Sequence, residues 1–267
     1  MSSQGNVVGS AIPGLVGRRH AAAWAAAALA LMAAAYPLAA VHAADAKPTK
    51  IGIIGTGKIG GTLATLWAKA GYSLMLSSRH PGELKSLAKS LGRNVEVGTP
   101  RAAAAFGDVV LISVPYGALP QVGHDLAHEL HGKVVLDTGN PYPQRDGSMA
   151  EDARRKGTGV ASAEYLPGVR LVRAFNAISY KDLASQSHRS GEPIAIPLAG
   201  DDPQALAVAQ RLVRDAGFEP VVVGGLAQAR LFDVGTPVYV KLLTAPELRQ
   251  ELGLTGGAAP HKAASSH

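Results

Sequence analysis

Three glycines within residues 55–60 have the spacing of a turn that binds phosphate. The stretch Gly55-Thr56-Gly57-Lys58-Ile59-Gly60 follows the pattern G-x-G-x-x-G, after an isoleucine-rich run and before an apolar helical pattern. In that setting Gly55 permits a tight turn, Gly57 lets the backbone approach a pyrophosphate, and Gly60 lets the helix pack on the strand. We therefore predict that residues 55–60 bind a dinucleotide through amides at a helix N-terminus. A glycine-rich turn without a ligand is the alternative.

The residues after the next predicted strand favour a phosphate over a free ribose hydroxyl. NAD enzymes usually carry Asp or Glu at this position, whereas this chain has Ser77-Ser78-Arg79-His80-Pro81. A serine hydroxyl and a guanidinium suit a ribose 2′-phosphate. We predict that Ser78 and Arg79 select NADP(H) over NAD(H). In the alternative interpretation Arg79 is a solvated surface charge.

Two further loops follow predicted buried strands. Ser113-Val114-Pro115 lies at the end of one, and Thr138-Gly139-Asn140 at the end of the next. Ligands of open α/β sheets bind at such carboxyl ends. We expect Ser113, Val114 and Pro115 near the diphosphate and ribose, and Asn140 near the nicotinamide ribose, although plain turns would look similar. Asn176 is the candidate catalytic residue, which either bonds the carboxamide or partner ring or caps a turn.

Alternating strand and helix patterns position these loops. The predicted strands are 50–55, 73–77, 95–98, 108–114, 133–137, 169–175, 194–199 and 220–223. The predicted helices are 58–70, 81–90, 100–106, 118–130, 148–156, 203–216 and, with breaks at Gly235 and Pro237, 226–250. This order indicates an α/β Rossmann fold with a doubly wound, mostly parallel sheet and a short helical C-terminal extension. One domain spanning 47–252 accounts for the pattern.

Composition excludes several classes of protein. Hydrophobic residues make up 47% of the 267 and charged residues 17%, which is typical of a globular chain. The net charge of +6 includes no basic run, so we expect no nucleic-acid partner. The absence of cysteine excludes disulfides, thiolate catalysis and cysteine-ligated metals.

The first 43 residues have the pattern of a secretory signal peptide. A charged segment ending in Arg18-Arg19 precedes an alanine-rich apolar run, and small residues follow it. We predict cleavage after Ala43, a periplasmic or secreted protein without a membrane span, and a partial resemblance to twin-arginine signals. A retained membrane anchor and a misassigned start, which would make the protein cytoplasmic, are the alternatives. The tail 253–267 is predicted to be disordered.

Two other groups of residues carry weaker chemical patterns. His124, His128 and His131 have helical spacing, and we interpret them as a solvent-exposed face rather than a metal site. Tyr180 and Lys181 are adjacent, so they do not form the Tyr-x-x-x-Lys pair of short-chain dehydrogenases and are interpreted as surface residues. We predict no metal ligand.

Residues 49–233 resemble the coenzyme F-420-dependent NADP oxidoreductase family, which includes the cytoplasmic domain of the six-transmembrane metalloreductases. The matching segments are IGIIGTGKIGGTLA, SSRHP, DVVLISVP, VVLDTGNP, LVRAFNAI and PLAGDDPQALAVAQRLVRDAGFEPVVVGGL. The N-terminal part is also similar to pyrroline-5-carboxylate reductase. The resemblance implies NADP(H) bound through 56–59, 78–79 and 113–115, with the nicotinamide close to Asn140 and residues 174–178. Phe175-Asn176-Ala177 departs from a histidine-containing segment of the archaeal enzymes, and the chain from Gly235 onward does not match them.

Two functions from different classes follow. The first is an NADP(H)-dependent oxidoreductase that passes hydride to a flavin, a deazaflavin or another small redox acceptor, which needs ring alignment more than acid–base groups. The second is a dinucleotide-binding sensor without turnover. Reduction of a cyclic imine is a weaker third, because little chain remains after residue 233 to form a substrate domain. The sequence leaves a homodimer open.

Overall fold

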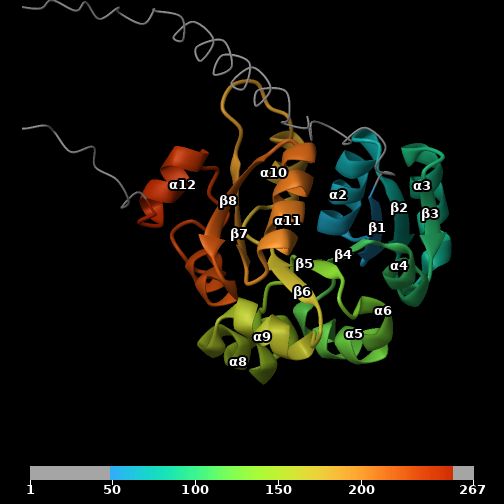
Figure 1. Cartoon of the computed structure of the whole chain (residues 1–267), viewed down its shortest axis with the longest axis horizontal. Coiled ribbons are helices and arrows are strands. Elements are labelled where there is room, and N and C mark those ends of the chain that lie inside the picture. Colours follow the sequence, from blue (N-terminus) through green and yellow to red (C-terminus); the bar gives the residue numbers. More distant parts are fainter. Residues whose placement is uncertain (1–48, 255–267) are drawn as a thin grey trace, which may run out of the picture. The chain divides into compact units, whose positions relative to one another are not determined.

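Eight strands form one sheet in the order β3-β2-β1-β4-β5-β6-β7-β8 in the computed structural model, which describes residues 49–254 (Figure 1). The strands are β1 (Lys50–Ile54), β2 (Ser73–Ser77), β3 (Val95–Gly98), β4 (Val109–Ile112), β5 (Val134–Asp137), β6 (Arg170–Arg173), β7 (Ala195–Gly200) and β8 (Glu219–Gly224). All neighbours are parallel except β6 and β7. The predicted signal peptide and residues 255–267 of the predicted tail lie outside the described residues.

Helices cover both faces of this sheet. They are α2 (Lys58–Lys69), α3 (Lys85–Leu91), α4 (Pro100–Phe106), α5 (Leu119–Asp125), α6 (Ala127–Leu130), α7 (Pro143–Asp146), α8 (Ser148–Lys156), α9 (Thr158–Tyr165), α10 (Tyr180–Ser185), α11 (Pro203–Asp215) and α12 (Ala245–Glu251). Three 3₁₀ helices, η1 (Pro81–Leu84), η2 (Tyr116–Ala118) and η3 (Leu226–Phe232), complete the connections. The alternation of parallel strands with helices confirms the predicted Rossmann fold.

Alternate residues of each central strand enter different layers of the core. Ile51 and Ile53 pack with Trp67 on the α2 and α11 side, where the Trp67 indole N–H donates to the Leu212 carbonyl at 2.9 Å. Val110 and Ile112 pack into the opposite layer. The period of two expected for a strand therefore buries both faces of the sheet.

The C-terminal prediction was wrong in part. Residues 226–232 form η3 and 245–251 form α12, but 233–244, here called the C-terminal segment, is mostly irregular. Gly235 has φ +90° and Val240 φ +54°, and Pro237 has no amide proton, so an α-helix cannot continue through them. The sequence patterns also did not predict α7, α9 and α10.

The three histidines do not share one helix as their spacing predicted. The chain breaks at Leu126 between α5 and α6, and His131 lies just beyond the end of α6. His124 and His128 are almost fully exposed. Among residues 49–254, no group of three or more histidine, cysteine or acidic residues is arranged to hold a metal ion.

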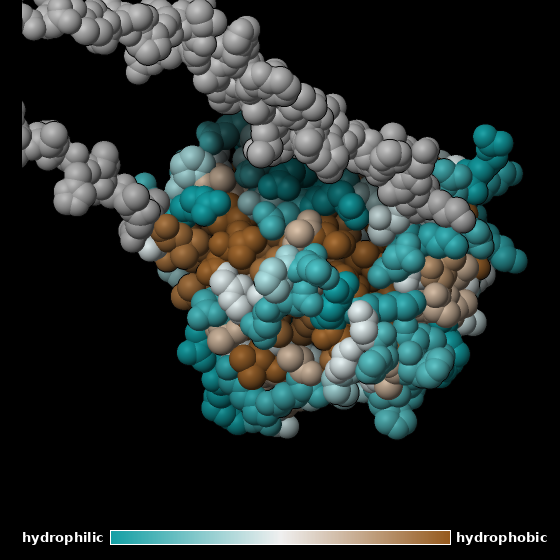
Figure 2. All heavy atoms as spheres, viewed as in Figure 1, coloured by the Kyte–Doolittle hydropathy of each residue, from teal (hydrophilic) through white to brown (hydrophobic). Residues whose placement is uncertain are grey.

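The outer surface is uneven in character. Figure 2 shows hydrophobic surface around β8 and α12 and a largely polar surface over α8. Leu231, Val240 and Leu242 are large hydrophobic side chains that remain exposed in or next to the C-terminal segment. In the part of the chain that the structure describes, no helix has both the length and the hydrophobicity of a membrane span.

Candidate cofactor and acceptor site

The glycine turn links the ends of β1, β2 and β4. Gly55 has φ +93°, and a Cβ there would lie 2.4 Å from the Ser113 carbonyl oxygen. A Cβ on Gly60 would lie 2.2 Å from the Gly55 carbonyl oxygen, so the helix rests directly on the turn. A Cβ on Gly57 would meet nothing within 4 Å. Gly55 and Gly60 are therefore required by packing, whereas Gly57 leaves an open approach to the backbone.

The N-terminus of α2 is open to an anion. Its first turn contains no acidic residue, and Gly57 at the N-cap provides no side-chain hydrogen bond. The Gly61 amide donates to the Gly57 carbonyl at 2.7 Å, so the amides of 58–60 precede the helical hydrogen-bond ladder. These amides and the helix dipole suit the phosphates of a dinucleotide, which is the fit that the sequence predicted.

Ser78 and Arg79 lie at the end of β2, beside this turn. The Ser77 carbonyl accepts from the amides of Gly55 and Thr56, both at 3.1 Å, which fixes the two loops together. The Ser78 hydroxyl accepts from the His80 amide at 3.0 Å, and Arg79 is exposed. Ser78 and Arg79 directly follow the residue that is hydrogen-bonded to the turn, but neither lines the cavity described next.

A cavity of about 420 Å³ opens at the carboxyl ends of β1, β4, β5 and β6. The predicted residues among its walls are Lys58, Ile59, Ser113, Val114, Pro115, Asn140 and Asn176. The other lining residues are Thr138, Gly139, Tyr142, Arg145, Phe175, Ile178, Ser179, Tyr180, Tyr239 and Val240. The structure thus brings together the loops that were predicted separately, at the strand-order reversal between β1 and β4 where such ligands bind.

Asn140 and Asn176 lie side by side between β5 and the C-terminal segment. The Asn140 amide donates to the Asn176 carbonyl at 2.7 Å, and the Asn176 amide donates to the Phe232 carbonyl at 3.3 Å. Asn176 is 2% exposed, and its Oδ1 has no partner among the described residues. Phe175 before it is buried with φ +58°, a strained conformation for a bulky residue. The hydrogen bonds to Asn140 and Phe232 hold Asn176 at the cavity wall despite this strain.

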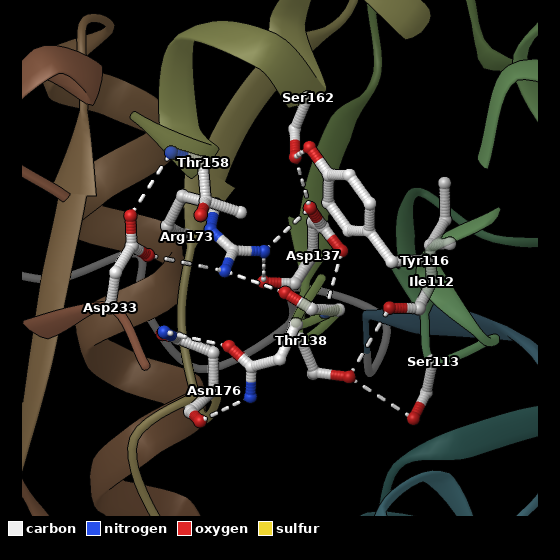
Figure 3. A network of polar contacts seen from close by, with 12 residues as sticks. Ile112, Ser113, Tyr116, Asp137, Thr138, Thr158, Ser162, Arg173, Asn176 and Asp233 are labelled. Atoms are coloured by element: carbon white, nitrogen blue, oxygen red, sulfur yellow. Dashed lines mark hydrogen bonds and ion pairs between the residues drawn. The ribbon is translucent and has the colours of Figure 1, made fainter. Parts of the chain in front are cut away.

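A buried ion pair supports the loop after β5 (Figure 3). The Arg173 guanidinium donates to the Asp137 carboxylate at 2.6 Å and to the Gly139 carbonyl at 2.7 Å. Ser162 donates to the same carboxylate at 2.7 Å, and the Tyr116 hydroxyl lies 3.2 Å from the Ser162 hydroxyl. Burial is the largest cause that raises the pKa of Tyr116. This network fixes the backbone that carries Asn140.

Three tyrosines that were not predicted from the sequence form aromatic walls of the cavity. Tyr142 from the loop after β5 and Tyr239 from the C-terminal segment place their hydroxyl oxygens 2.7 Å apart; we call them the tyrosine pair. Tyr180, interpreted as a surface residue, is 37% exposed but lines the cavity, with the Lys58 ammonium 4.6 Å from its ring centroid. Only a strand-end position marks Tyr142 in the sequence, and nothing local marks Tyr239.

Open parallel strands, a glycine turn at the switch point and a free helix N-terminus define a dinucleotide-binding protein of the Rossmann class. A family model described as NADP oxidoreductase, coenzyme F420-dependent, matches residues 50–141. The F420-dependent NADP reductase of Methanothermobacter thermautotrophicus is 31% identical over 209 residues, which cover 72% of this chain and 88% of that protein. The chain belongs to the family of F420-dependent NADP oxidoreductases, and it is an NADP-dependent oxidoreductase.

Two further relatives bear on the comparison. The rat metalloreductase STEAP3 is 30% identical over 188 residues, or 68% of this chain, and the match spans only 35% of that protein. A crystal structure of a hypothetical protein from Sinorhizobium meliloti aligns with a TM-score of 0.66 at 26% identity, over 74% of this chain and 96% of that one. The fold therefore recurs nearly whole in one relative and as one part of a longer protein in the other.

Proposed function

We propose that this protein oxidises NADPH and reduces a small, planar redox acceptor in the cavity at the carboxyl ends of β1, β4, β5 and β6. NADPH supplies a hydride when it is bound. The observation that carries the proposal is the position of the cavity, which continues from the glycine turn past Ser113 to Asn140 and Asn176. A cofactor held at the turn would thus extend toward a space with room for a second ring.

The proposed cofactor contacts follow the order of the loops. Amides of 57–60 hold the pyrophosphate, and Ser78 and Arg79 hold the 2′-phosphate. Ser113, Val114 and Pro115 lie along the ribose, and Asn140 borders the nicotinamide. Asn176 is proposed as a positioning residue, since its amide is engaged by the Phe232 carbonyl and its side chain is almost fully buried.

A flavin or deazaflavin is the proposed type of acceptor. Ile59, Pro115 and Ile178 give the cavity apolar surface suited to flat rings. The name of the methanogen relative supports a deazaflavin acceptor in that protein, and the names of the metalloreductases support metal reduction in those longer proteins. A hydride carries two electrons, so a ring that accepts two electrons matches the cofactor directly, whereas a ferric ion accepts one.

Anaerobic NADPH oxidation by residues 44–267 tests this function. The acceptors would be FMN, riboflavin, menadione and ferric citrate, and binding of NADPH and NADH would be measured in parallel. We expect NADPH to bind more tightly than NADH and at least one ring acceptor to be reduced. Tight NADPH binding with no reduction of any acceptor would favour a sensor without turnover. Reduction of ferric citrate alone would contradict the ring acceptor.

A further inference from the structure

The tyrosine pair lines the cavity and is built from two parts of the chain that are far apart in sequence. Tyr142 follows β5, and Tyr239 comes from the C-terminal segment, 97 residues later. Asn140 also donates toward the Tyr239 hydroxyl, at 3.4 Å. Two distant parts of the chain therefore meet in one hydrogen-bonded group that faces the cavity.

The tyrosine pair has one O–H hydrogen-bond donor that no described residue accepts. Two tyrosine hydroxyls carry two protons, and the bond between their oxygens uses one of them. The hydrogen bond from the Asn140 side-chain amide to the Tyr239 oxygen uses an N–H of Asn140, so it engages neither hydroxyl proton. One O–H donor of the tyrosine pair therefore remains for a ligand in the cavity, whichever hydroxyl carries it.

The Tyr239 hydroxyl keeps its proton at neutral pH. Burial, followed by the hydrogen bond with Tyr142, raises the pKa of Tyr239. The Arg145 guanidinium lies 5.2 Å from the Tyr142 ring centroid and donates to the Asn140 carbonyl at 2.8 Å. Arg145 thereby fixes both the ring and the loop that carry the group.

The fold bears strain to bring Tyr239 to this place. Val240 has φ +54°, although left-handed backbone is strongly disfavoured for a β-branched residue. Its amide donates to the Ala177 carbonyl at 2.9 Å, which ties the C-terminal segment to the loop after β6. Strained residues of this kind persist where neighbouring structure holds them, and they are enriched at binding sites.

The charged and apolar residues of the cavity walls indicate which kind of ligand fits the free O–H donor. No aspartate or glutamate is among the residues that line the cavity, and its charged members are Lys58 and Arg145. Ile178 and Val240 add apolar surface. A flat ring with a carbonyl oxygen at its edge satisfies the free O–H donor and the apolar walls together.

We propose that the tyrosine pair is an acceptor-binding site, which orients a carbonyl-bearing flavin-type ring by donating one hydroxyl hydrogen bond to a carbonyl oxygen at its edge. The inference rests on the proposed function, because it assigns the acceptor side of the same cavity. It adds two residues, Tyr142 and Tyr239, and a chemical requirement on the acceptor.

Riboflavin binding to the protein saturated with NADP⁺ tests the site, since the bound dinucleotide blocks its own subsite. Quenching of flavin fluorescence would give the affinity of riboflavin and of FMN, which share a ring and differ by a phosphate. We expect both to bind, and the double variant Tyr142→Phe/Tyr239→Phe to weaken both by about tenfold, the loss of one hydrogen bond in a desolvated site. NADP⁺ affinity should stay within about twofold of the original.

The control is Tyr165→Phe, since Tyr165 packs edge-on against Tyr116 and does not line the cavity. Unchanged riboflavin affinity in the folded double variant would overturn the site, as would binding of FMN without riboflavin, which would indicate a phosphate contact. Should the double variant not fold, the original protein is titrated with phenazine, a flat tricyclic ring without a carbonyl oxygen, and an affinity equal to that of riboflavin overturns the site. If the original protein does not bind NADP⁺ at all, the proposed function itself is refuted.

Discussion

The Arg173 guanidinium lies 2.6 Å from the Asp137 carboxylate, with both side chains shielded from solvent between β5 and β6. Replacing Arg173 with Met leaves a buried carboxylate without its counter-charge, so the free energy of unfolding should fall by about 3–5 kcal/mol in urea denaturation. Arg155→Met is the matched control, since Arg155 pairs with Asp152 at the exposed surface and should cost less than about 1 kcal/mol. Equal losses in the two variants would contradict this view of the pair.

Gly57 and Gly60 should separate binding from folding. A Cβ on Gly57 meets open space, so Gly57→Ala should keep the unfolding free energy within about 1 kcal/mol and still weaken NADPH binding, because the methyl group occupies the approach to the amides. A Cβ on Gly60 meets the Gly55 carbonyl, so Gly60→Ala should destabilise the fold by about 1–3 kcal/mol. Thermal unfolding and NADPH titration measure both. The prediction fails if Gly57→Ala unfolds the protein.

Arg79 should decide between the two dinucleotides. We expect Arg79→Ala to weaken NADPH binding by about tenfold or more, because a charge-assisted phosphate contact is lost, and to leave NADH affinity unchanged. Arg93→Ala, on the loop before β3, is the control for a general loss of positive charge. Calorimetric titration of the original protein and of both variants with NADPH and with NADH gives the six affinities. An original protein with equal affinity for NADPH and NADH would refute the assignment.

The Asp146 carboxylate should make the free energy of unfolding fall as the pH drops below the usual pKa of an aspartate. Burial raises the pKa of its carboxyl, but hydrogen bonds from Arg145 and from the amides of Tyr142 and Gly117 outweigh that effect, so the pKa lies below its usual value. A lowered pKa in the folded state gives stability that is present above the unfolded pKa of about 3.9 and is lost as pH falls further.

Urea denaturation of the original protein and Asp146→Asn between pH 3 and 7 measures this effect. The original should be more stable by about 2 kcal/mol near neutral pH, and the difference should shrink as the medium becomes acidic. A difference that grows on acidification would show the opposite sign of linkage.

Local patterns were enough to predict the sheet and the loops that meet at its carboxyl edge. The helix predicted from residue 100 begins at Pro100, and the hydroxyl of Thr99, a common N-cap residue type, accepts from the Ala102 amide at 3.1 Å. The glycine turn was recognisable because strand, turn and helix adjoin in sequence. Local sequence patterns cannot predict the position of Tyr239 in the cavity, because it is defined by a hydrogen bond to the hydroxyl of Tyr142, 97 residues earlier in the chain. The same applies to Arg173, whose fully buried charge is intelligible only beside Asp137.

Because Tyr142 and Tyr239 are far apart in sequence, the two parts of the cavity wall that carry them are synthesised at different times. Synthesis delivers the glycine turn and the loops after β4 and β5 before the C-terminal segment, so these parts of the cavity wall are made before the part that carries Tyr239. Contacts between such distant residues close late because the intervening chain must first be ordered. A change confined to the C-terminal segment therefore alters the cavity wall that carries Tyr239 and leaves the glycine turn as it is.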